Sequence, residues 1–316
     1  MTSRGDVAMR VRLAGAGGGA GATPPVAVPG AVATRRPPSF APLLIVAAST
    51  SVFVGTAMAT TLFSSVGWGA TAGLRLTLAA VVLLALARPR MRGRSRREWV
   101  QLGLLGATLA VMGTAFYGAV DRVPLGVAAT IEFLGPLTVA VVGSRRRVDL
   151  VWVALALLGV AALAGNLMGG GSPAGVGLAL LAAAGLGAYL LASQRVGDQA
   201  EGLDGLALSV TFAAVLVSPF TFGSAGAIAA PSVLGVGILV ALAGIVVPTA
   251  LEMEALRRMR AGTVAVLLSL EPAIAAVVGF ALLGQRLSVA ETVGAVLVVL
   301  ASVGALSGGA ARGPTG

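Results

Sequence analysis

The sequence predicts an all-α membrane protein with ten transmembrane helices, arranged as two inverted repeats of five helices each. Three features of the chain support this fold class. Hydrophobic residues make up 57% of the 316 residues and charged residues only 11%, which is too few charges to cover a soluble domain of this length. The apolar residues gather in ten segments, and the number of arginines alternates between high and low from one connection to the next.

Each apolar segment is roughly 20 residues long, which is enough to cross the hydrocarbon core of a bilayer as a helix. No such segment precedes Pro42, so residues 1–41, rich in Gly, Ala, Pro and Arg, are expected to form a disordered tail without a signal peptide. A wrongly assigned start codon would explain the same tail. The predicted spans are 42–63, 67–87, 99–118, 124–143, 149–168, 174–193, 205–222, 232–253, 262–283 and 289–307.

The arginines predict the orientation of the chain in the membrane. Loops on the same side as the N-terminus hold thirteen arginines, whereas loops on the opposite side hold only Arg122 and Arg286. Because basic residues collect in cytoplasmic loops, both termini are expected in the cytoplasm. The formal net charge of +10 is then a topology signal, and no nucleic-acid partner is expected.

The two halves of the chain repeat a short pattern. After a shift of 136 residues, Gly126 aligns with Gly262 and Pro136 with Pro272. Because five is an odd number, the second half enters the membrane in the opposite orientation, and such inverted repeats are typical of transporters that bind substrate at mid-membrane. The predicted organisation is a disordered cytoplasmic N-terminal tail (1–41), a first five-helix repeat (42–173), a second five-helix repeat (174–307) and a short cytoplasmic C-terminal tail (308–316).

Three ionisable side chains fall near the centres of predicted spans, at one depth: Arg75, Glu132 and Glu271. An unpaired charge there costs roughly 2.5–3.5 kcal/mol, so these groups are expected to face the bundle interior, a wet cavity or one another. They predict a site for a cation, a proton or an ammonium group, with the planar guanidinium of Arg75 as partner for a carboxylate. The alternative is structural: two acids that hydrogen-bond as neutral carboxyls, or pair with Arg75, and so hold helices together.

Three prolines are expected to break helices. Pro136 cannot donate a hydrogen bond to the carbonyl of Glu132, and Pro272 likewise frees the carbonyl of Leu268. Each half of the chain therefore places a carboxyl group and a spare carbonyl close together at mid-membrane. Pro248 is expected to break the eighth span.

Further polar residues lie within the apolar spans. Glu252, Tyr117 and Asn166 are candidates for lining a vestibule; the alternatives are solvation at a helix end for Glu252 and interhelical hydrogen bonds for the other two. His, Cys and Lys are absent, which removes zinc sites, thiol catalysis and Ser-His-Asp chemistry. No metal, cofactor or catalytic residue is therefore expected, and a carboxylate-only intramembrane enzyme and a channel are the alternatives to a transporter.

Four stretches of the chain resemble one transporter family. The longest is "VPLGVAATIEFLGPLTVAVVGSRRRVDLVWVALALLGV" at 123–160, and the others are "GLRL" around Arg75, "VPTALEMEAL" at 247–256 and "SLEPAIAAVVGFALLGQRLS" at 269–288. They are similar to the threonine/homoserine exporter branch of the EamA group, within the drug/metabolite transporter superfamily. The similarity covers about residues 42–307.

This resemblance implies a bacterial inner-membrane exporter of small amino acids, driven by the proton-motive force. The two inverted halves predict alternating access as its mechanism. Arg75 would hold the substrate carboxylate and Glu132 its ammonium group or a proton, while Glu271 would line the opposite wall. A drug or other metabolite exporter on the same scaffold is the alternative. One position departs from the family, which commonly has Leu-Gly-Glu after the ninth span where this chain has Leu283, Gly284 and Gln285. No oligomeric state is predicted.

Overall fold

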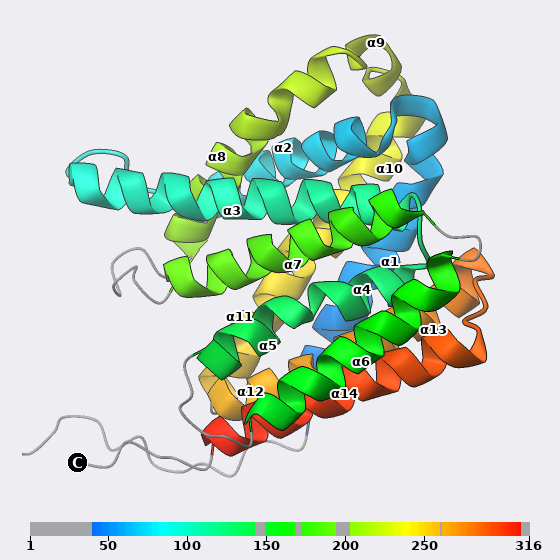
Figure 1. Ribbon diagram of the computed structural model, residues 1–316. Coiled ribbons are helices and arrows are strands. Elements are labelled where there is room, and N and C mark those ends of the chain that lie inside the picture. The colour runs from blue at the N-terminus through cyan, green and yellow to red at the C-terminus, as the bar shows by residue number, and fades with distance from the viewer. Residues whose placement is uncertain (1–39, 143–148, 169–171, 194–202, 260, 311–316) are drawn as a thin grey trace, which may run out of the picture. The chain divides into compact units, whose positions relative to one another are not determined.

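The computed structural model is helical wherever the chain is described, with no strand in those residues (Figure 1). The structure describes residues 40–142, 149–168, 172–193, 203–259 and 261–310. The predicted all-α class is confirmed for this part of the chain, whereas nearly all of the two expected tails lies outside it.

The helices follow one another along the sequence with short connections. In chain order they are α1 (Ala41–Val66), α2 (Trp68–Ala87), α3 (Arg96–Val120), α4 (Leu125–Glu132), α5 (Leu134–Val142), α6 (Asp149–Met168), α7 (Pro173–Ser193), α8 (Leu203–Phe222), α9 (Ala225–Ile228), α10 (Pro231–Ala241), the π-helical turn η1 (Leu242–Val246), α11 (Val247–Arg258), α12 (Ala261–Leu268), α13 (Glu271–Leu283) and α14 (Val289–Ala310).

Six helices in the described residues are long and apolar enough to cross a membrane: α1, α2, α3, α7, α8 and the continuous rod Pro231–Arg258. Shorter apolar helices cover Leu125–Val139, Val151–Ala162, Glu271–Leu283 and Val289–Ala301. Each predicted span therefore contains apolar helix. Because full length is reached in six of them, the count of ten spans and the inverted repeat stay predictions.

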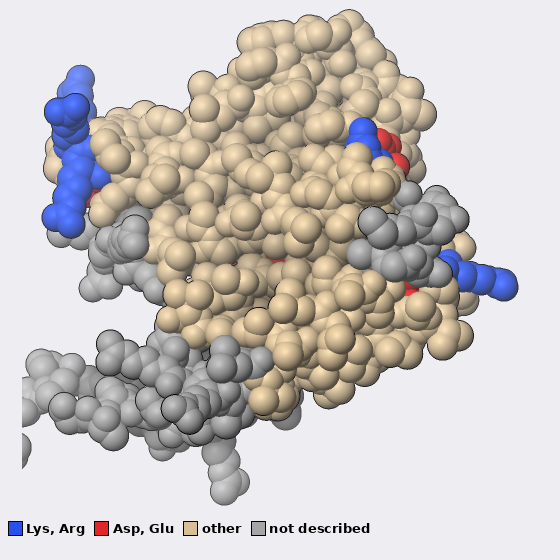
Figure 2. Space-filling view, in the orientation of Figure 1, with Lys and Arg blue, Asp and Glu red and all other residues tan. Residues whose placement is uncertain are grey.

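The surface of the helices is apolar over most of its area. Large side chains such as Val81, Leu157 and Val215 are about three-fifths exposed. In the view of Figure 2, basic side chains gather near the two ends of the long helices, and the surface between those ends is almost entirely uncharged. Such a continuous apolar surface is what a bilayer core requires and what a soluble protein avoids.

Two of the predicted spans are interrupted near their middles, each time beside a glutamate. α4 ends at Glu132 and α5 begins two residues later, with Pro136 in its first turn. α12 ends at Leu268 and α13 begins at Glu271, with Pro272 as its second residue. Proline is tolerated in the first turn of a helix because its missing N–H has no intrahelical partner there.

Pro248 lies beside a third interruption, in the eighth predicted span, which takes another form. The helix does not end before it but widens into η1 and continues as α11. A π-helical turn changes the register of the backbone hydrogen bonds, which lets the helix pass the missing N–H of proline. The Ser51 hydroxyl of α1 donates a hydrogen bond of 2.8 Å to the Ala243 carbonyl within this turn.

Close helix packing depends on small residues at the contacts. α2 packs against α8, α3 against α7, and α6 against α14. Where α3 meets α8, a Cβ atom at Gly106 would lie 2.6 Å from the Ser209 carbonyl oxygen, so only glycine fits. Backbones approach in this way in membrane bundles because van der Waals contact is a principal force between helices in lipid.

Candidate functional site

The contact between α4 and α13 brings the two broken spans together. A Cβ atom at Gly126 would lie 2.9 Å from the Ala276 Cα, and one at Gly279 would lie 3.5 Å from the Leu125 Cβ. Residue numbers rise along one helix as they fall along the other, so the two half-helices run antiparallel. The α4–α13 pair is then expected to end with Glu132, the last residue of α4, near Glu271, the first of α13.

The two carboxyl groups interact electrostatically. The charge of Glu271 acts on Glu132, and both side chains are half-buried within the bundle. Ser49 of α1, itself fully buried, donates a hydrogen bond of 3.2 Å from its hydroxyl to Oε1 of Glu271. Three helices from different parts of the chain therefore meet at these acids.

Arg75 lies on α2 and is 8% exposed. The guanidinium carbon lies 4.5 Å from the centroid of the Tyr117 ring on α3, which is cation–π geometry. Gly113, on the same helix as Tyr117, leaves room for the guanidinium, since a Cβ atom there would come within 2.6 Å of Nη2. The chain thus encloses a permanent positive charge between α2 and α3.

The structure separates Arg75 from both glutamates by more than salt-bridge distance. Within the described residues, no carboxylate oxygen lies within 4.0 Å of the guanidinium, and Nε has no hydrogen-bond partner. The positive charge still acts on Glu132 through space. The alternative in which Arg75 and Glu132 form a contact ion pair is therefore not what the structure shows, and the guanidinium keeps hydrogen-bonding capacity.

The vestibule candidates differ in what surrounds them. Glu252 of α11 is half-buried, and its charge acts on both Glu271 and Tyr189. Tyr117 is fully buried, and its hydroxyl has no hydrogen-bond partner among the described residues. Asn166 belongs to α6, but its side chain lies outside the described part of the structure.

The balance of charge indicates what the site can do. The charge of Glu252 acts on Glu271, and that of Glu271 acts on Glu132. Among the described residues, Arg75 supplies the positive charge that acts on Glu132. Excess negative charge in a bundle interior is costly unless cations or protons compensate for it. The arrangement can therefore hold a proton or an ammonium group beside the acids and a carboxylate beside the guanidinium. In the described residues no cluster of ligands is suited to a metal ion.

Sequence reasoning did not single out Ser49, Ser51 or Gly113. Each is one small residue among many in an apolar span, and nothing in its neighbours marks it. Their roles depend on which helix faces them, which only the packing reveals.

Known proteins similar to this chain are transporters. The EamA-like transporter family matches residues 173–307. The threonine/homoserine exporter RhtA of Salmonella typhimurium strain LT2 is 36% identical over 275 residues, covering 86% of this chain and 93% of the relative. RhtA of Escherichia coli strain K12 is 36% identical over 274 residues, covering 85% of this chain and 92% of the relative.

A crystal structure that is 21% identical shares the fold, with a TM-score of 0.52, and the match covers 87% of this chain and 99% of that chain. The apolar helices together with these relatives indicate a membrane protein with several spans. Because more than a third of the residues are identical over most of both chains, the chain belongs to the EamA-like transporter family.

Proposed function

We propose that this protein exports small amino acids of the threonine and homoserine type across the bacterial inner membrane, in exchange for protons. The RhtA relatives are named as threonine/homoserine exporters, which supports the substrate class. The proposed mechanism rests on two glutamates, Glu132 at the end of α4 and Glu271 at the start of α13, which interact electrostatically. The positive charge of Arg75 acts on Glu132.

A zwitterionic amino acid matches this set of charges. Its carboxylate would lie against the Arg75 guanidinium, whose planar array of donors suits a carboxylate. Its ammonium group would lie against Glu132, and Glu271 would form the opposite wall. Glu132 can hold either a proton or the ammonium group, but not both, so arrival of one releases the other and couples the two movements.

Alternating access would move the two predicted repeats against each other around this site. Equivalent contacts in the two halves support it, because α3 packs against α7 and α1 packs in the same way against α11. The arginine-rich loop between α2 and α3 would face the cytoplasm, as would both termini. Substrate would then leave at the end of the bundle where α3 turns into α4.

The test is efflux of labelled threonine and homoserine from preloaded cells that lack their own exporters. The intact protein is compared with Glu132→Gln and Glu271→Gln at matched membrane expression, with and without a protonophore. Saturable, proton-dependent efflux of unchanged amino acid, lost in Glu132→Gln, supports the proposal. Chemically altered solute would indicate an enzyme, and non-saturable flux a channel.

Two other results would change the assignment. Full proton-dependent efflux by Glu132→Gln would make Glu132 a packing residue and transfer its role to Glu271 and Arg75. If the intact protein moved neither amino acid, a drug or other metabolite exporter on the same scaffold would replace this proposal, and a broad solute screen would follow.

A further inference from the structure

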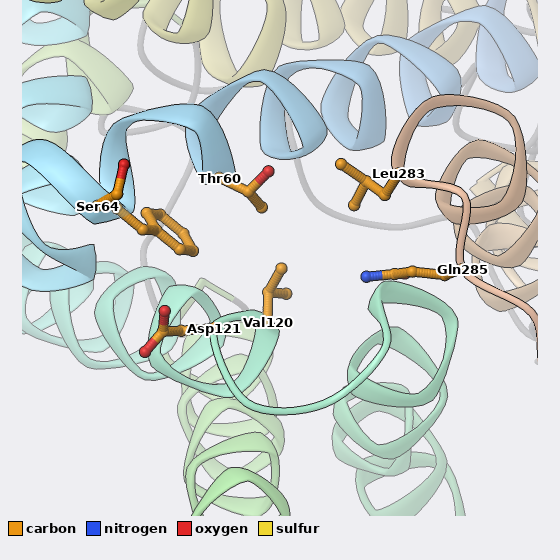
Figure 3. A pocket seen from close by; sticks show the side chains of 7 residues that line it. Thr60, Ser64, Val120, Asp121, Leu283 and Gln285 are labelled. Carbon is orange, nitrogen blue, oxygen red and sulfur yellow. The ribbon is translucent and has the colours of Figure 1, made fainter.

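A pocket opens at the end of the bundle where α3 turns into α4, away from the arginine-rich loop. It has a volume of about 380 Å³, which is within the range of small-molecule sites. Figure 3 shows its labelled side chains converging from three segments: α1, the end of α3, and the end of α13 with the chain that follows it. Its lining residues are Thr60, Phe63, Ser64, Val120, Asp121, Leu283 and Gln285.

The polar groups of this pocket are already partly engaged. The Thr60 hydroxyl donates to the Ala57 carbonyl of its own helix at 2.7 Å. Asp121 forms an ion pair of 3.2 Å with Arg122. Gln285 accepts a hydrogen bond of 2.9 Å from the backbone N–H of Leu125. Because these polar side chains already have partners within the protein, they should bind a polar solute weakly. Weak binding suits a passage for solute better than a high-affinity binding site.

Aromatic side chains separate the pocket from the buried arginine. Phe63 lines the pocket, and its ring centroid lies 5.6 Å from that of Tyr117. Tyr117 in turn lies against the guanidinium of Arg75. The order from outside to inside is therefore pocket, Phe63, Tyr117, Arg75.

Of the two rings, Phe63 is the one that can move. Tyr117 is fully enclosed, whereas Phe63 is only partly buried and borders open space in the pocket. Phe63 also lies in the last turn of α1, four residues before Gly67, which has a φ of 82° and ends the helix. The Phe63 carbonyl accepts a hydrogen bond of 3.0 Å from the Gly67 N–H, so the backbone is held and the movement is a rotation of the side chain.

We propose that this pocket is the external vestibule of the translocation path and that Phe63 is the gate between it and Arg75. The inference rests on the proposed export of zwitterionic amino acids. Rotation of the Phe63 ring into the pocket uncovers Tyr117 and gives the solute a route past the aromatic pair. The native packing of Phe63 against Tyr117 keeps that route closed for most of the time.

The absence of cysteine makes a direct accessibility test possible. Thr60→Cys reports on the vestibule and Arg75→Cys on the far side of the gate. Gly244→Cys is a second inner reporter, because a Cβ atom there would lie 3.5 Å from the Arg75 Cδ. Each reporter is combined with native Phe63, Phe63→Ala or Phe63→Trp, and treated with a charged, membrane-impermeant thiosulfonate applied to intact cells.

Thr60→Cys is expected to react rapidly in all three backgrounds, which also controls for folding. The inner reporters should react slowly with native Phe63 and at least about tenfold faster with Phe63→Ala, since modification follows the fraction of time the gate is open. Phe63→Trp should keep them slow. Equal rates at both inner reporters in the native and Phe63→Ala backgrounds would overturn the proposal, as would a Thr60→Cys that does not react.

The modification chemistry does not require transport, so the two proposals fail separately. If the gate behaves as expected but no threonine leaves the cells, the substrate assignment fails while the vestibule stands. If threonine efflux is normal and Phe63→Ala leaves the inner reporters unchanged, the gate fails while export stands.

Discussion

The first broken span and the second hold their glutamates in opposite ways. Glu132 ends α4, where the helix dipole places partial negative charge, whereas Glu271 begins α13, where the dipole places partial positive charge. The same anionic group is thus disfavoured at one break and favoured at the other, by about 0.3–1 kcal/mol in each case at an exposed helix end and more when partly buried.

Hydrogen bonding widens this difference. Glu271 accepts a hydrogen bond from Ser49, but no group in the described part of the chain donates one to Glu132. Glu132 instead experiences the charges of Arg75 and Glu271 at a distance. A proline at the same place in both halves therefore does not give the two glutamates equivalent environments. Glu271 is anchored by a hydrogen bond from Ser49 and by its place at the start of α13, whereas Glu132 has neither among the described residues and is left to exchange its counter-charge, as proposed above.

The largest effect on efflux is expected from displacing the guanidinium of Arg75, whose charge acts on Glu132. Gly113→Ala places a Cβ atom 2.6 Å from the present position of Arg75 Nη2, so the end of this flexible side chain must shift. Losing a charged contact of about 1.5–3 kcal/mol should lower threonine efflux roughly ten- to a hundredfold, with little loss of folded protein. Efflux is measured at matched membrane expression, beside the yield of monodisperse protein in detergent.

The matched control is Gly103→Ala on the same helix, where an added Cβ atom meets nothing within 4 Å. It should leave both efflux and yield unchanged. Gly113→Ala with efflux within about twofold of the native rate would mean that the position of the guanidinium is immaterial, because a twofold change corresponds to only about 0.4 kcal/mol, well short of the expected loss of about 1.5–3 kcal/mol.

Much of this arrangement could be predicted from the sequence because membrane helices leave a strong pattern. Runs of apolar residues place the helices, and the depth of Glu132 and Glu271 within their runs places both acids at mid-span. Pro136 and Pro272 indicate where helix geometry is disturbed, because a missing N–H has a local effect. The family followed from long stretches that resemble known transporters, and the relatives bear it out.

The rest depended on facing surfaces, which local patterns do not encode. The pairing of Ser49 with Glu271 spans 222 residues of sequence, and the stacking of Arg75 on Tyr117 joins different helices. At Pro248 the sequence indicates a disturbed helix, but not that the backbone changes register in a π-helical turn before α11 begins. A proline determines which hydrogen bond is lost, while the surrounding helices determine how the backbone compensates.

Removing the anchor of Glu271 should have a smaller effect than moving Arg75. Ser49→Ala deletes one hydrogen bond of 3.2 Å, worth about 0.5–1.5 kcal/mol, so efflux should fall roughly two- to tenfold. Thr50→Ala is the control, because within the described residues the Thr50 hydroxyl bonds to the Val46 carbonyl of its own helix and to no other group. Equal efflux by the two variants would remove the anchoring contrast between the acids. If Ser49→Ala lowered efflux as much as Gly113→Ala does, the anchor of Glu271 would matter as much as the position of Arg75.

The smallest effect is expected where the two broken spans are tied together. Gln285, after α13, accepts a hydrogen bond from the Leu125 N–H at the start of α4, so both half-helices should respond as one body. Gln285→Met keeps the length of the side chain but removes the acceptor, and should cost about 0.5–1 kcal/mol of unfolding free energy in a detergent titration. Gln285→Glu keeps an acceptor, adds a charge that the start of α4 favours, and should retain native stability. If Glu destabilises as much as Met, the contact does not join the spans, and the two acids must then be positioned independently by α1 and α2.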